Sequence, residues 1–265
     1  MAWSRIKAAL AASCLLSIAG FGLRASSSRP AVFSAVQATA GSALEQEAQP
    51  NNPEPTPAGQ GSEAPAPPAI PFFVIIDPAH GGTDQGALLS PKLPEKDVNL
   101  ALARRLKSEL HERGIQSRLL RDSDVTLSLD QRAESANEQH AAVYLSLHAG
   151  VPGEGVRVYA PALTTTETLS SRFVPWELAQ ANSLPRSQGL AQKIAIELNA
   201  RDVRAVSLAS PIRPLNNVIA PAVAVEVTPA PDDVSGLMAQ KFQTTVVAAI
   251  ASAIVQLRPE LETRQ

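Results

Sequence analysis

The sequence predicts one α/β domain, with a twisted, mostly parallel sheet, helices on both of its faces and a zinc site at the strands' carboxyl edge. Short runs that are apolar throughout suit strands buried on both faces. Segments with apolar residues at helical spacing alternate with these runs. A His directly follows two of the runs, at the edge where open α/β sheets hold ligands. We expect the domain to span residues 71–260.

The N-terminal half of this domain contains five expected elements. A buried strand covers residues 72–77 and is closed by Pro78 and two glycines. A helix with Asp97 as its N-cap runs to Arg113, because apolar residues recur at helical spacing and Gly114 follows. A strand over residues 115–120 comes next. Ser128 and Gln131 then form a capping box for a helix to about residue 139, and residues 142–147 form a buried strand.

The C-terminal half continues the alternation. Residues 155–159, 203–208 and 222–227 are expected strands, and residues 187–200 form a helix with one apolar face. A long final helix over residues 233–257 is capped by Asp232 or Asp233 and stopped by Pro259. We interpret residues 160–186, which show little periodicity, as an insertion that is partly helical near residues 176–181.

The segment before the domain shows the pattern of an exported protein. Residues 1–27 start with two basic residues and continue with an uncharged apolar stretch, which is typical of a signal peptide or an N-terminal anchor. Residues 28–70 become rich in Pro and Ala and form an expected disordered linker. The sequence leaves open whether the first segment is cleaved. Either way, we expect the domain in the periplasm or the cell envelope.

Composition restricts the partners of this chain. Its 265 residues carry a formal net charge of -2, with a pI near 6.1, and only 4% are aromatic. Neither a basic surface nor a set of stacking platforms is indicated, so we expect no nucleic-acid partner. Contact with the membrane is expected only through an uncleaved N-terminal anchor.

Three residues form a candidate metal site. His80 and His148 each follow an apolar run, and Glu95 lies fifteen residues after His80, within reach of a loop that folds back. Two His and a carboxylate are a common ligand set for a catalytic zinc ion, which keeps one position for water. Each residue alone also has an ordinary structural explanation, in packing for the His residues and in the helix dipole for Glu95.

Glu226 is the candidate catalytic residue. It lies within the apolar run of residues 222–227, where a carboxylate is costly unless it is paired or functional. At the same edge of the sheet it can act as general base on a water molecule that the metal activates. An ion pair with a buried Arg is the alternative. For Asp77, the sequence leaves open a hydrogen bond to His80 or a turn. His111 and His140 are not expected to bind metal.

The motifs resemble those of the zinc-dependent N-acetylmuramoyl-L-alanine amidases, the family often called amidase type 3. The resemblance covers residues 74 to about 257 and rests on six motifs in the order of the family: Ile-Asp-Pro-Ala-His-Gly-Gly (76–82), Glu-Lys-Asp-Val-Asn-Leu (95–100), Leu-Arg-Asp-Ser-Asp-Val (120–125), Ser-Leu-Asp-Gln-Arg (128–132), Tyr-Leu-Ser-Leu-His-Ala (144–149) and Pro-Ala-Val-Ala-Val-Glu (221–226). It implies that His80, Glu95 and His148 are the Zn2+ ligands and that Glu226 is the catalytic glutamate.

The implied reaction is hydrolysis of the amide between N-acetylmuramic acid and L-alanine in peptidoglycan, the expected substrate. The chain departs from the family at Ala79, usually Gly, at Gly150, usually Asn, and in the loop after Glu226. In some members an inserted helix covers the zinc until a protein activator moves it. Residues 160–186 lie where such an insert would be, and Glu167 or Glu177 would then contact the metal; a wall of the substrate groove is the alternative role of this segment. The alternatives are a zinc peptidase or deacetylase acting on peptidoglycan and a wall-binding protein without turnover.

Overall fold

The computed structural model describes residues 71–150, 153, 155–163, 175–229 and 233–262. The expected signal segment (1–27) and the linker (28–70) lie outside the described residues. Among the helices that are described, none has the length and apolar character to cross a membrane.

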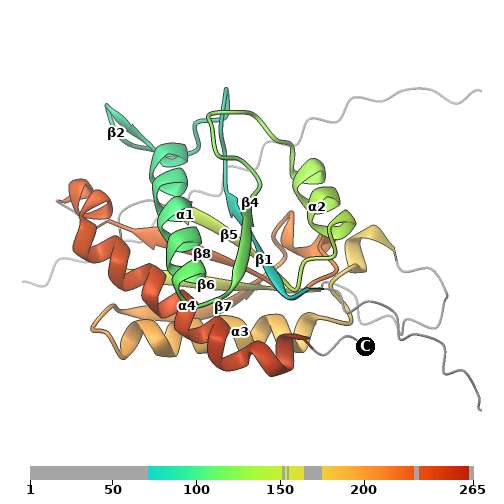
Figure 1. The fold of residues 1–265 in the computed structure, drawn as a ribbon. Coiled ribbons are helices and arrows are strands. Elements are labelled where there is room, and N and C mark those ends of the chain that lie inside the picture. Colours follow the sequence, from blue (N-terminus) through green and yellow to red (C-terminus); the bar gives the residue numbers. More distant parts are fainter. Residues whose placement is uncertain (1–70, 151–152, 154, 164–174, 230–232, 263–265) are drawn as a thin grey trace, which may run out of the picture. The chain divides into compact units, whose positions relative to one another are not determined.

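A six-stranded sheet lies at the centre of the described part (Figure 1). Its spatial order is β4 (Gln116–Leu119), β1 (Phe73–Pro78), β5 (Val143–Ala149), β8 (Ala222–Thr228), β6 (Gly155–Pro161) and β7 (Ala205–Ser210). The first four strands are parallel, β6 is antiparallel to β8, and β7 is parallel to β6. Five residues, 150–154, connect β5 with β6, which is too short for a parallel crossover. The predicted mostly parallel sheet is confirmed.

Helices cover both faces of this sheet, as predicted (Figure 1). On one face the larger core cluster joins α1 (Glu95–Glu112), α3 (Leu184–Asn199) and α4 (Gln240–Glu262) to β1, β5 and β8. On the other face a smaller cluster includes α2 (Leu129–Glu138), Ala222 and Ala224. Side chains alternate along a strand, so Glu226 lies on the α2 face with Ala222 and Ala224. The catalytic candidate therefore faces the more thinly covered side of the sheet.

Two predicted helix starts had different outcomes. The capping box of Ser128 and Gln131 is present at the start of α2, as predicted. The N-cap predicted at Asp97 is wrong, because α1 begins at Glu95 with Pro94 as its N-cap. The amide of Glu95 donates to the carbonyl of Ala87 at 2.8 Å, so a contact outside the helix replaces the side-chain cap.

The C-terminal segment differs from the single helix predicted. A 3-10 helix, η3 (Val234–Met238), precedes α4, and Asp233 caps η3 through the amide of Gly236. The predicted stop at Pro259 is wrong, since α4 continues through this proline to Glu262. Buried Leu261 and a 2.7 Å ion pair between Arg258 and Glu262 hold the last turn in place. These contacts thus offset the cost of the helical hydrogen bond that Pro259 cannot donate.

Several short elements were not predicted. A hairpin of β2 (Leu88–Ser90) and β3 (Leu93–Pro94) precedes α1, and a 3-10 helix, η2 (Leu215–Asn217), lies on the α2 side beside the expected η1 (Trp176–Leu178). These elements are too short to show a period. Within the expected insertion, β6 continues to Pro161, and η1 is the helical part predicted near residues 176–181; residues 164–174 lie outside the description.

Candidate metal centre

The structure brings His80, Glu95 and His148 together. One ligand atom from each lies within 4.8 Å of the others. Glu95 Oε1 is 3.2 Å from His80 Nε2 and 3.1 Å from His148 Nδ1. The two imidazole rings are nearly perpendicular, with their centroids 5.5 Å apart. The residues come from the loop after β1, the first turn of α1 and the end of β5, as the sequence predicted for a site at this edge.

His80 is held by its backbone and by its second ring nitrogen. Its φ of +63° is a left-handed conformation, which is uncommon for a residue other than Gly. Arg132 fixes this turn by donating to the His80 carbonyl at 2.9 Å. Asp84 Oδ2 lies 2.8 Å from Nδ1 of His80, so the ring presents Nε2 to Glu95. A carboxylate on the outer nitrogen is the usual support of a metal-binding His.

Asp77 has neither of the two roles considered from the sequence. It lies inside β1, fully buried, and accepts hydrogen bonds from Arg132 and Tyr144. Ser146 Oγ donates to Asp77 at 3.4 Å and lies 3.2 Å from Nε2 of His148. Ser146 therefore links Asp77 to the candidate ligand His148. Through Tyr144 and Ser146, Asp77 also joins β1 to β5.

Glu95 is 6% exposed and is surrounded by donors. The Ala87 amide donates to Oε2 at 2.9 Å, and the Ala149 amide donates to Oε1 at 3.2 Å. Burial opposes ionisation of this carboxyl, but hydrogen bonds from His148, His80 and the Ala87 amide outweigh burial and hold its pKa far below the usual range. Conversely, the hydrogen bond to Glu95 raises the pKa of His80 despite partial burial. Glu95 is therefore ionised, as a carboxylate that binds a metal must be.

The three residues fit a zinc ion. Two ligand atoms at about 2.0–2.1 Å from a tetrahedral centre lie roughly 3.3 Å apart. The contacts of Glu95 Oε1 with His80 Nε2 and His148 Nδ1, at 3.2 and 3.1 Å, are close to that separation. Two imidazoles and one carboxylate, with outer contacts from Asp84 and Ser146, are also the donor set and support expected of such a site.

Glu226 lies on the strand next to His148, in register with it. Its Oε2 accepts a hydrogen bond from the Tyr159 hydroxyl at 3.0 Å and lies 3.2 Å from Arg157 Nη1. Burial, and then the charge of Glu226, raises the pKa of Tyr159, so its hydroxyl stays protonated and donates. The ion pair considered from the sequence is present, although Arg157 is one-third exposed rather than buried.

A cleft of about 380 Å³ joins these groups. It is lined by His80, Ala87, Glu95, His148, Gly150, Tyr159, Ile212, Ala224 and Glu226. A second cavity of about 280 Å³, towards α2, is also lined by His80 and His148. His80 and His148 therefore line both cavities.

Gly150 makes room for the Glu226 carboxylate. A Cβ at position 150 would lie 1.8 Å from Glu226 Oε1, well inside van der Waals contact. We predict that Gly150→Ala displaces this carboxylate and lowers kcat by up to about 10²-fold, since a misplacement of about 1 Å costs that much. Gly189→Ala is the matched control, because a Cβ there meets nothing within 4 Å. Steady-state kinetics with zinc titration checks the pair; a wild-type kcat in Gly150→Ala would contradict the prediction.

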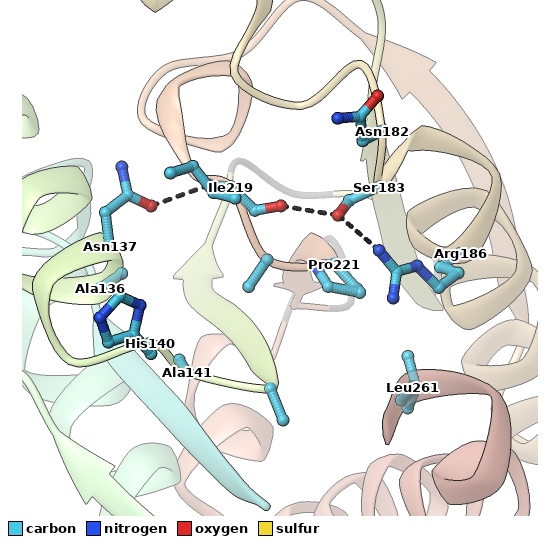
Figure 2. A pocket seen from close by; sticks show the side chains of 12 residues that line it. Ala136, Asn137, His140, Ala141, Asn182, Ser183, Arg186, Ile219, Pro221 and Leu261 are labelled. Carbon is cyan, nitrogen blue, oxygen red and sulfur yellow. Dashed lines mark hydrogen bonds between the residues drawn. The ribbon is translucent and has the colours of Figure 1, made fainter. Parts of the chain in front are cut away.

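The remaining His residues and Glu177 lie outside the metal group. His140 lines a separate cavity of about 200 Å³ near the start of β5 and β8, together with Ser183 and Arg186 (Figure 2). There the Ser183 hydroxyl donates to the Ile219 carbonyl at 2.6 Å. His111 is exposed on α1, as predicted. Glu177 is exposed in η1 and is not among the residues that could hold a metal, whereas Glu167 lies outside the described residues.

Sequence reasoning missed Arg157, Tyr159 and Asp84 as members of the site. The first two alternate with buried valines along β6, so the pattern indicated a shared face of the strand. The sequence pattern gave no sign that this face lies beside Glu226, because that position depends on the antiparallel pairing of β6 with β8. Asp84 lies four positions after His80 in a loop whose sequence gave no sign of a contact between them.

Comparisons with known proteins identify the family of this chain. The sequence profile of the N-acetylmuramoyl-L-alanine amidase family matches residues 74–256. AmiC of Escherichia coli O6:H1 is 35% identical over 107 residues, which are 40% of this chain and 24% of that protein. LytC of Bacillus subtilis is 30% identical over 135 residues, 51% of this chain and 25% of that protein. The matches thus span about a quarter of the length of these curated relatives.

Solved structures share the fold. AmiC2 of Nostoc punctiforme superposes with a TM-score of 0.54 and 26% identity, over 71% of this chain and 97% of that one. An amidase structure from Clostridium difficile 630 has a TM-score of 0.59 at 24% identity, over 72% and 98% of the two chains. Because its identity is this low, the similarity to the Clostridium difficile structure supports the fold alone. Because the family profile matches more than half of the sequence, this chain belongs to the N-acetylmuramoyl-L-alanine amidase family.

Proposed function

We propose that this protein is an exported, zinc-dependent N-acetylmuramoyl-L-alanine amidase that hydrolyses the bond between the lactyl group of N-acetylmuramic acid and L-alanine in peptidoglycan. The observation that carries the proposal is the joint geometry of His80, Glu95 and His148 with Glu226. Three ligands of the kind zinc prefers converge in one cleft, and a carboxylate on the adjacent strand lines the same cleft.

Each of these side chains has a defined part in the reaction. His80, Glu95 and His148 would hold the zinc ion, which polarises the scissile carbonyl and makes a water molecule acidic enough to lose a proton. Glu226 accepts that proton as the water oxygen bonds to the carbonyl carbon. It then returns the proton to the amine as the C–N bond breaks. The products are a carboxylic acid on the sugar side and a free L-alanine amine on the peptide side.

Tyr159 and Arg157 orient the base. Both contact Oε2 of Glu226, so Oε1, beside Gly150, is the oxygen left to carry the proton. The covered Oε2 also keeps the carboxylate from rotating away from the substrate. This division of the two oxygens is consistent with a general base that must first accept a proton and later donate it.

Export fits the substrate. Peptidoglycan lies outside the cytoplasmic membrane, and the sequence of residues 1–27 has the character of a signal peptide or anchor. We propose that residues 28–70 tether or space the catalytic domain, residues 71–260, in the periplasm or cell envelope. A protein activator is compatible with the insertion after β6, although no described contact indicates one.

Product analysis tests the proposed activity. Purified peptidoglycan is digested with the full chain, with a zinc chelator, and with the chelator followed by excess zinc. We expect mass spectrometry to find free stem peptides that begin with L-alanine in the first and third samples only. Cleavage within the stem peptide would indicate a peptidase, and loss of acetate a deacetylase. Intact peptidoglycan in all samples, with retained binding to the wall, would support the non-catalytic alternative.

A further inference from the structure

A row of three functional side chains crosses the sheet from the candidate metal centre. His148 on β5 pairs with Glu226 on β8, and Glu226 pairs with Arg157 on β6. All three belong to the face of the sheet that carries α2. Neighbouring strands lie about 4.8 Å apart. Arg157 is therefore one strand spacing beyond the general base, on the side away from the metal ligands.

Arg157 keeps capacity to bind a second anion. Among the described residues, its guanidinium contacts one carboxylate, through Nη1 and Oε2 of Glu226 at 3.2 Å. The side chain is 33% exposed, and a guanidinium offers five N–H donors. Gly153 packs against this guanidinium, since a Cβ there would lie 2.9 Å from Nη2. Arg157 does not line the cleft itself, so a ligand reaches its exposed donors by extending from the cleft past Glu226.

The leaving peptide points in this direction. Glu226 must protonate the L-alanine nitrogen, so that nitrogen lies beside Glu226 during the reaction. From this nitrogen to the α-carboxyl carbon of the next residue, the covalent reach is about 5–6 Å. Arg157 Nη1 lies 3.2 Å from Glu226 Oε2, so this reach is long enough to pass from the nitrogen beside Glu226 to the guanidinium. A carboxylate on the second residue of the peptide would therefore meet the guanidinium of Arg157.

We propose that Arg157 is a specificity-determining residue that recognises a free α-carboxylate on the residue following L-alanine in the leaving peptide. This inference rests on the proposed amidase function and adds the substrate class: stem peptides with an acid, rather than a carboxamide, at their second residue. Charge-assisted hydrogen bonds from Arg to a carboxylate favour the acid, whereas a carboxamide brings no negative charge to this position.

The test compares two muropeptides that differ in one group. Both carry N-acetylmuramic acid, L-alanine and a second residue that is either D-glutamate with a free α-carboxylate or its α-carboxamide. With the zinc-loaded full chain, we expect kcat/KM to be roughly tenfold higher for the acid. Arg157→Gln should bring the ratio of the two values close to one, and Arg157→Lys should retain part of it. Arg104→Gln, on exposed α1, is the matched control and should keep the wild-type ratio.

The ratio of kcat/KM for the acid to that for the carboxamide distinguishes two roles of Arg157, recognition of the substrate carboxylate and orientation of Glu226. If Arg157 only positions Glu226, Arg157→Gln lowers the rate on both substrates equally and the acid preference persists, which overturns the inference. If the wild type cleaves neither substrate, the proposed amidase function fails instead. Calorimetry with the free dipeptides, L-alanine followed by the acid or the carboxamide, then decides on Arg157. Tighter binding of the acid that Arg157→Gln abolishes supports the inference, and equal affinities reject it.

Discussion

Glu226→Gln is expected to lower kcat for amide hydrolysis by about 10³-fold while zinc affinity and thermal stability stay close to wild type. The substitution keeps the size of the side chain and its contact with the Tyr159 hydroxyl, but removes the group that accepts a proton. General acid–base catalysis commonly contributes about 10²–10⁴-fold. Zinc affinity should persist because Glu226 is not one of the three residues that could hold the metal. Product release from a defined muropeptide and a zinc titration measure the two quantities.

Glu134→Gln is the control for this experiment. Glu134 is exposed on α2 and has no part in the cleft, so its substitution removes one carboxylate from the surface without touching the site. Its kcat should equal that of the wild type. A Glu226→Gln protein that retains the wild-type rate would refute the role of Glu226. Loss of zinc in the same variant would instead assign Glu226 to the metal.

The residues of the metal group were predictable because their positions depend on local patterns. His80 follows β1 and His148 lies near the end of β5, and parallel strands bring their carboxyl ends to one edge of the sheet. Glu226 stood out as a charge within an apolar run. These sequence patterns can be recognised without knowledge of the strand order or of any side-chain contact. The structure accordingly brings together the three ligands chosen from the sequence, while their roles in catalysis stay predictions.

The contacts that orient these residues were not predictable in the same way. Arg157 reaches Glu226 only because β6 turns back and pairs with β8, sixty-nine positions apart in the sequence. Likewise, Arg132 reaches the β1 end from α2. Such contacts depend on the register of distant segments, which local periodicity does not encode. The stop predicted at Pro259 failed for a related reason, since burial of Leu261 is a tertiary contact.

A buried ion pair beside the candidate metal centre should contribute strongly to the stability of the domain. Asp77 and Arg132 are 0% and 3% exposed, and they contact each other directly. Arg132 also donates to the carbonyls of Pro78 and His80, so the pair joins α2 to the end of β1. Removal of one charge from such a pair leaves the other buried without compensation. We therefore expect Asp77→Asn to lower the free energy of unfolding by about 3–5 kcal/mol.

Thermal unfolding measures this effect. For a domain of this size, that loss corresponds to a fall in Tm of roughly 10 °C. Asp122→Asn is the matched control, because Asp122 pairs with Arg104 at 2.7 Å on the surface, where both side chains are more than half exposed. Exposed pairs contribute little, so its Tm should stay near that of the wild type. If the two variants show equal Tm values, the buried pair does not stabilise the fold.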